Sequence, residues 1–282
     1  NVRPFSGGNV IVEELSHVEN PNASWYSGND ELSIGENQGI SAAEYSIKQA
    51  AVPVVITGLE MIQNSGRERM IDLMEARLQI AEGTMKNLIE AGLFSDGTGY
   101  GGNQLTGLGA GVVASPATGT YGGINRANFT FWRNQATGSL GAQTNDTIQA
   151  NMNELWAECS RNSDVPDLII GGNTFWAVFM GSLQNIQRIA SDESARLGFP
   201  SMRYMTADVV LGGGIGGSQG ATVAHFLNTE YLHYRPFAGR NMVPLAPEKR
   251  YATNQDAEVQ ILAFAGNLTC SGARYQGYFQ GS

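Results

Sequence analysis

The residues with the clearest potential for chemistry are glycines in the G-x-G-x-x-G spacing that binds nucleotide phosphates. The two sets are Gly97, Gly99 and Gly102, and Gly212, Gly214 and Gly217. A dinucleotide site needs a strand before the glycines and a helix after them, because the N-terminus of that helix binds the pyrophosphate. The first set follows a helical pattern, and the second precedes an alternating, strand-like pattern. We therefore expect the glycine-rich segment 97–111 to form a flexible surface hinge beside a helix, and neither set to bind phosphate.

Other catalytic patterns are missing from the sequence. The three histidines are His17, His225 and His233, and no H-x-x-x-H, H-E-x-x-H or G-x-S-x-G spacing occurs. These spacings carry metal sites and activated serines. The adjacent acids Glu13 and Glu14 are expected to be solvated surface residues. The sequence thus predicts no catalytic residue, no cofactor and no metal ligand, and it gives an enzymatic function no specific support.

The composition is typical of a protein that either buries much of its surface in contacts with other subunits or has a mostly neutral polar surface. The chain has 282 residues, of which 15% are charged, against about a quarter in typical soluble domains. Thirty-six residues are glycine, and the formal net charge is −9. An acidic chain without basic clusters argues against binding driven by phosphate neutralisation. Cys159 and Cys270 are too few for a disulfide framework, and no apolar run reaches membrane-spanning length.

A long polar stretch near the N-terminus predicts a projecting arm. A short strand pattern at residues 9–15 is followed by the polar residues 16–49 and by a second strand pattern at residues 50–60. We expect the two strand patterns to flank a two-stranded arm, with Pro53 placing the second strand at a sheet edge. Because an isolated hairpin is marginally stable, Trp25 and Tyr26 are predicted to anchor the arm in a subunit interface.

The remaining patterns predict a long helix and then mixed α and β structure. Ser65 to Glu68 matches a capping box, an apolar stripe runs from Met70 to Leu88, and Gly92 is placed to end the helix. A helix from residue 145, a strand within residues 165–172 and a helix from Asn173 follow. Alternating patterns to the end of the chain predict antiparallel strands.

The order of these elements resembles the major capsid proteins of tailed bacteriophages. The most distinctive segments are "NSGRERMIDLMEARLQIAEGTM" and "GLFSDGTG", preceded by "AAVPVVITGLE". The resemblance implies an α+β, Hong Kong 97-like phage capsid fold. Its parts would be an N-terminal arm (1–20), an extended β-hairpin loop (21–58), a peripheral domain (59–125 and 231–282) with a long spine helix (65–92), and an axial α/β domain (126–230).

The same resemblance implies a structural function. Subunits of this family form hexamers and pentamers of an icosahedral shell that encloses double-stranded DNA without sequence-specific binding. Scaffolding, portal and decoration proteins are the implied partners, with no membrane. The implied location is the virion, after assembly in the bacterial host cytoplasm. The interface residues predicted for this chain are Trp25, Tyr26, Lys48 and Pro53. Lys48 falls in the extended loop, but no asparagine is identified to join it in the isopeptide bond that some members form.

Two alternatives stay open from the sequence. The same fold builds nanocompartment (encapsulin-like) shells that enclose cargo enzymes. A cytoplasmic enzyme that binds a phosphate ligand through its glycine loops belongs to a different class. Protein instead of DNA inside a purified particle would indicate a nanocompartment and not a phage capsid. Nucleotide binding by a small soluble species would support the enzyme.

Overall fold

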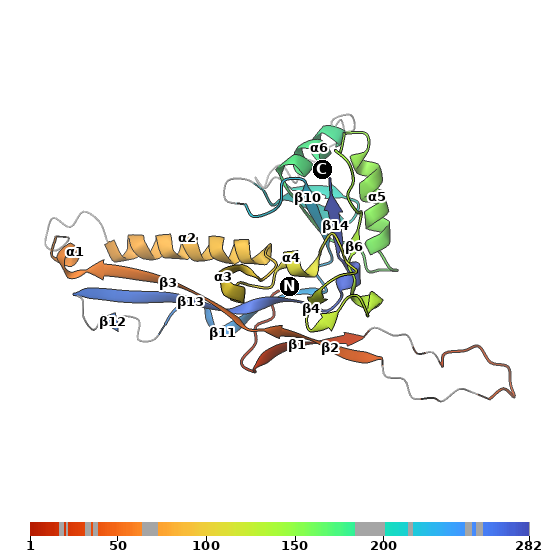
Figure 1. The fold of residues 1–282 in the computed structure, drawn as a ribbon, viewed down its shortest axis with the longest axis horizontal. Helices are drawn as coiled ribbons and strands as arrows, with labels where there is room; N and C mark the ends of the chain where they lie inside the picture. The colour runs from red at the N-terminus through yellow and green to blue at the C-terminus, as the bar shows by residue number, and fades with distance from the viewer. Residues whose placement is uncertain are drawn as a thin grey trace.

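The chain folds into an elongated body from which an arm projects (Figure 1). The computed structural model describes residues 1–16, 20, 22–31, 35, 39–63, 73–183, 201–213, 217–245, 250–251 and 256–281. At one end of the body the long helix α2 (Leu73–Leu93) lies along a sheet, and at the other end two helices cover a second sheet. The arm leaves the body on the side away from α2.

The base of the arm is a two-stranded antiparallel sheet of β1 (Val10–Ser16) and β2 (Ile40–Ser46). A two-stranded arm is therefore confirmed, but the expected second strand is wrong. The pattern at residues 50–60 contains β3 (Lys48–Thr57), which pairs with β13 (Ala257–Cys270) in the body instead. The sequence did not predict β2 because its inward-facing residues, Ala43 and Tyr45, form only a weakly apolar pattern.

The helix-covered sheet at the first end contains β11 (Leu232–Pro244), β13, β12 (Arg250–Tyr251) and β3. Among the described strands β3 pairs only with β13, so the edge position predicted from Pro53 is confirmed. Helix α2 (Leu73–Leu93) packs on this sheet. Its buried residues Ala81 and Met85 belong to the predicted apolar stripe, and Met85 packs with Phe264 of β13.

The ends of the long helix differ from the prediction. The capping box at Ser65 to Glu68 lies outside the described residues. A capping box occurs instead at α1 (Gly58–Gln63), where Thr57 N donates to Glu60 Oε2 at 3.1 Å and Glu60 N donates to Thr57 Oγ1 at 3.4 Å. Gly92 does not end α2, which continues through Leu93. A Cβ at Gly92 would lie 2.9 Å from the Leu105 side chain, so this glycine permits close packing.

The second sheet has six strands in the order β6-β14-β10-β7-β9-β8. Their bounds are β6 (Gln135–Ala136), β7 (Leu168–Gly171), β8 (Ser201–Tyr204), β9 (Ala207–Leu211), β10 (Val223–Leu227) and β14 (Gly277–Gln280). Helices α5 (Ile148–Cys159) and α6 (Asn173–Leu183) cover it (Figure 1). The antiparallel pairing of β10 with β7 and β14 confirms the pattern at the end of the chain. The domain boundaries stay a prediction, although β14 lies in this sheet and not in the sheet beside α2.

Short elements connect the two sheets. They are α3 (Gly99–Gly102), α4 (Leu108–Gly111), β4 (Thr120–Tyr121), β5 (Ile124–Asn125), η1 (Thr130–Trp132) and η2 (Ala273–Tyr275). Trp132 is 1% exposed and its Nε1 donates to the Tyr121 carbonyl at 2.8 Å. Tyr121 packs edge-on against Tyr45 with ring centroids 5.4 Å apart. The base of the arm is thereby anchored in the core. Among the described helices, none is both long and apolar enough to cross a membrane.

Candidate functional site

The two described histidines are buried in the body. His225, on β10, contacts the rings of Phe94 and Tyr278, and its Nδ1 is 3.0 Å from Gln219 Oε1. Burial lowers the pKa of His225 to about 4, so the ring is neutral at pH 7. Burial also lowers the pKa of His233. Within the described part of the chain no group of three His, Cys, Asp or Glu residues could hold a metal.

The expectation that Glu13 is a solvated surface acid is wrong. Glu13 is 6% exposed, and its Oε1 lies 3.0 Å from Arg235 Nη1 on β11. The same oxygen accepts a hydrogen bond from Thr269 Oγ1 at 2.9 Å. Period-two alternation turns Glu13 to the same face of β1 as Ile11 and Leu15. A buried carboxylate needs such partners, and these contacts join the base of the arm to the body.

Asn267 of β13 is a buried polar residue that the sequence analysis missed. Its Oδ1 accepts from Thr106 N at 2.9 Å, and its Nδ2 donates to the Ser46 carbonyl at 2.8 Å. Asn267 is 0% exposed. One side chain thus connects β13, the glycine-rich segment and the end of β2. In the sequence the signal was a polar residue within the mostly apolar run of residues 261–270. The structure buries nine consecutive residues of β13 there, and buried polar groups need partners.

Part of the glycine-rich segment is packed against the body, and the expected flexible surface hinge is wrong for residues 105–111. Leu105, Leu108 and Val112 are buried. A Cβ at Gly107 would lie 2.3 Å from the Leu93 carbonyl oxygen. Glycine is used here because the backbone lies directly against the end of α2. In the second glycine set, Gly214 lies outside the described residues.

The far end of the arm presents two unsupported aromatic residues. Trp25 is 103% exposed and Tyr26 is 68% exposed, and every residue from 23 to 31 is exposed. A tight turn follows, in which Asp30 N donates to the Ser27 carbonyl and Ser27 N donates to Asp30 Oδ2, both at 2.8 Å. The placement agrees with the predicted role in an interface, which stays a prediction.

The other two predicted interface residues lie on the body. Lys48 is the first residue of β3 and not part of the projecting arm, and its Nζ donates to the Gly102 carbonyl. Pro53 is exposed at the middle of β3. The structure therefore does not bring these two residues together with Trp25 and Tyr26 in one subunit. Residues 48–57 pair with β13, so Lys48 lies outside the two-stranded base of the arm, and its assignment to the extended loop stays a prediction.

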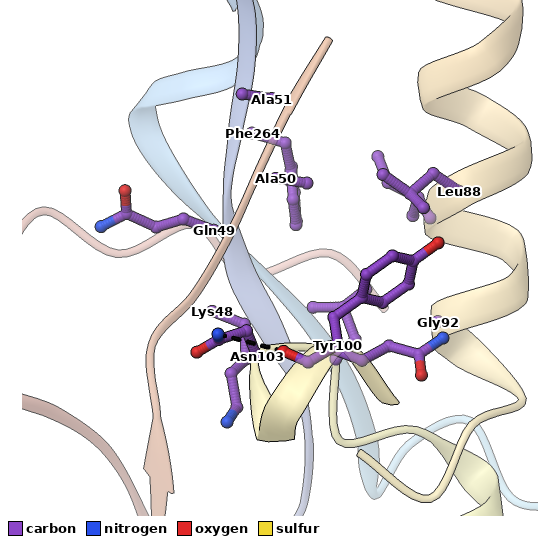
Figure 2. A pocket seen from close by; sticks show the side chains of 12 residues that line it. Lys48, Gln49, Ala50, Ala51, Leu88, Gly92, Tyr100, Asn103 and Phe264 are labelled. Atoms are coloured by element: carbon purple, nitrogen blue, oxygen red, sulfur yellow. Dashed lines mark hydrogen bonds between the residues drawn. The ribbon is translucent and has the colours of Figure 1, made fainter. Parts of the chain in front are cut away.

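A pocket of about 240 Å³ lies between α2 and β3 (Figure 2). Its lining is mostly apolar. The lining consists of Lys48, Gln49, Ala50, Ala51, Leu88, Ile89, Gly92, Tyr100, Asn103, Gln104, Leu105 and Phe264. Tyr100 is 74% exposed. In Figure 2 its ring lies on the side of the pocket toward α2.

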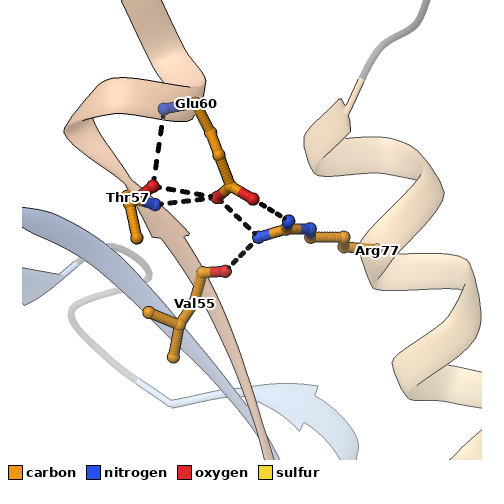
Figure 3. Close-up of polar contacts among 4 residues, drawn as sticks. All are labelled: Val55, Thr57, Glu60 and Arg77. Carbon is orange, nitrogen blue, oxygen red and sulfur yellow. Dashed lines mark hydrogen bonds and ion pairs between the residues drawn. The ribbon is translucent and has the colours of Figure 1, made fainter.

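An ion pair joins α2 to the start of α1, close to the end of β3 (Figure 3). The two terminal guanidinium nitrogens of Arg77 on α2, Nη1 and Nη2, donate to the Glu60 carboxylate, and Nη1 also donates to the Val55 carbonyl of β3. Hydrogen bonds from Arg77 lower the pKa of Glu60 to about 2. The fork geometry of arginine lets one side chain hold both β3 and the start of α1.

Solved structures with the same fold cover nearly the whole chain. The cyanophage A-1(L) capsid subunit is 15% identical, with a TM-score of 0.67, over 99% of this chain and 90% of its own. The capsid of Myoviridae phage XM1 is 11% identical, with a TM-score of 0.61, over 100% and 89%. The capsid of an empty GTA particle is 9% identical, with a TM-score of 0.62, over 100% and 88%.

Sequence comparison finds no match: neither a family model nor a curated protein is similar to this chain. The structural similarity shows the fold, which is the Hong Kong 97-like capsid fold expected from the sequence. It extends over both sheets and the arm, since at least 99% of the chain is covered in these three structures.

Proposed function

We propose that this chain is the major capsid protein of a tailed phage, which assembles into hexamers and pentamers of an icosahedral shell. The observation that carries the proposal is the capsid fold over essentially the full chain. The exposed aromatic residues of the arm add to it. An apolar side chain held in water far from its own core gains stability only when another molecule covers it.

The composition also supports a shell subunit. Ring contacts bury different surfaces of each copy, and a lightly charged surface lowers the cost of burying them. A net charge of −9 suits a shell that encloses double-stranded DNA without binding it tightly, because tight binding to phosphates needs clustered basic residues. Scaffolding, portal and decoration proteins, the virion location and assembly in the host cytoplasm belong to the same proposal.

Electron microscopy of the purified chain tests the proposal. Closed shells support it, and a persistent small species that binds nucleotide contradicts it. Particles that contain cargo protein instead of DNA would favour the nanocompartment alternative. In the same assay, Trp25→Ala with Tyr26→Ala is expected to reduce the yield of particles while the circular dichroism of the subunit stays unchanged. The matched control is Trp25→Phe with Tyr26→Phe, which keeps an aromatic ring at both positions.

A further inference from the structure

We propose that Glu13 is a positioning residue, which sets the direction in which the arm leaves the body. This direction is a property of the single chain, and only its consequence for particles rests on the proposed assembly function. Three observations carry the proposal: the apolar contacts of the arm base (β1 and β2), the polar contacts of Glu13, and the different ways in which β1 and β2 are joined to the body.

Apolar contacts hold the arm base on the body without fixing its angle. Ile11 and Leu15 of β1 belong to one buried cluster with Leu232 of β11 and Leu268 of β13. Apolar burial is non-directional, and a core of suitable composition loses its unique arrangement before it loses its stability. These contacts alone therefore allow several arm directions that differ little in energy.

Glu13 supplies contacts that depend on direction. Its Oε1 lies 3.0 Å from Arg235 Nη1 on β11 and accepts a hydrogen bond from Thr269 Oγ1 on β13 at 2.9 Å. Hydrogen bonds weaken steeply when their angle falls below about 120°. The two partners lie on neighbouring, paired strands, so a rotation of the arm base lengthens or bends both contacts. One direction of the arm is preferred for this reason.

The two strands of the arm base are joined to the body differently. Strand β2 ends at Ser46, and β3, which pairs with β13, begins two residues later. This end of the arm base is held by the chain itself and acts as a pivot. Strand β1 instead follows Gly7 and Gly8; a Cβ at Gly7 would meet nothing within 4 Å, and Gly8 has a φ of 119°. Glu13 pairs with Ala43, about 10 Å along β2 from the pivot, and this second fixed point determines the direction.

The ion pair of Glu13 with Arg235 contributes more to direction than to stability. Replacing a buried ion pair by apolar side chains of similar volume is often neutral for the free energy of unfolding, because the desolvation of both charges is avoided. The variant Glu13→Leu with Arg235→Met is therefore expected to keep the urea midpoint of the wild type and to lose the preferred arm direction. A purely structural role predicts the reverse, a lower midpoint with an unchanged direction.

Double electron–electron resonance on the unassembled chain measures the direction. Spin labels are attached at Ile40→Cys on β2 and Ile80→Cys on α2, where the native side chains are 73% and 69% exposed. Cys159 and Cys270 are buried, and burial raises the pKa of both thiols to about 12, so they stay unlabelled. Labelled chain is diluted into unlabelled chain, so that only distances within one copy are recorded.

The expected change is large enough to measure. Ile40 lies about 20 Å along β2 from Ser46, so a rotation of about 10° moves it by about 3 Å. The wild type is expected to give one narrow distance distribution, and the double variant a distribution that is wider or shifted by about 3 Å or more. Glu14→Gln is the matched control, because Glu14 is exposed on the opposite face of β1, and it is expected to match the wild type. A folded double variant with the wild-type distribution would overturn the proposal.

Thr269→Val decides the question if the double variant does not fold. It removes one hydrogen bond to Glu13 and is expected to widen the distribution by a smaller amount; an unchanged distribution would refute the proposal. In particles, electron microscopy of the double variant is expected to show mixed diameters. Uniform particles would refute the link to assembly and leave the arm direction in the single chain standing. A wild-type chain that forms no particles would instead refute the proposed function.

Discussion

Protonation of His225 should destabilise the folded subunit in mild acid. Gln219 Nε2 donates to the Val223 carbonyl at 3.0 Å, so its Oε1 is free to accept from His225 Nδ1–H. The His225 Nε2 atom is then an acceptor, and it has no partner among the described residues. A proton added there would place a charge in a fully buried site beside Phe94 and Tyr278. The neutral ring is preferred, which is why burial lowers the pKa to about 4.

The size of the effect follows from linkage. The unfolded chain binds this proton with a pKa of about 6.5, and the folded chain binds it only near 4. Between these values the unfolded state holds more protons, so stability is present above pH 6.5 and is lost as the pH falls. Each pKa unit corresponds to about 1.4 kcal/mol. The free energy of unfolding should therefore fall by about 2 kcal/mol from this residue alone between pH 7 and pH 5.

Urea titrations of the unassembled subunit at pH 7 and pH 5 measure this fall. Other groups also titrate, so the decisive quantity is the difference between the wild type and His225→Gln. This variant has a polar, non-titrating side chain at the same position. It is expected to lose about 2 kcal/mol less between the two pH values, whatever its stability at pH 7. An identical fall in both proteins would refute the account of His225.

Three further changes test the packing and polar contacts. Gly107→Ala places a Cβ 2.3 Å from the Leu93 carbonyl oxygen and should cost about 1 to 3 kcal/mol in a urea titration; an unchanged midpoint would contradict the close contact. Asn267→Leu should cost about 1 to 3 kcal/mol for each buried group that it leaves unpaired, measured in the same way. Glu60→Gln should remove the stability that the wild type loses as the pH falls from 4.5 toward 2, seen as a flatter acid titration.

The sequence predicted the elements whose patterns repeat. The stripe through Ala81 and Met85 identified the long helix, because residues three and four apart share one helix face. The run at residues 168–171 and the face of Ile148 and Met152 identified the strand and helix of the second sheet. Order of elements then sufficed to predict the capsid fold, and Pro53 identified an edge strand because proline cannot donate to a ladder.

Only the tertiary structure decided which segments meet. Strand β3 could have paired with β1 by pattern alone, but it lies beside β13, which follows it by about two hundred residues. Pairing over such distances depends on packing that no local pattern encodes. The same holds for Glu13. The sequence predicts a surface acid, but the fold buries it against Arg235 and Thr269. The pocket beside Tyr100 exists because α2, β3 and the glycine-rich segment lie next to one another. The spacing of residues within any one of these segments does not predict that arrangement.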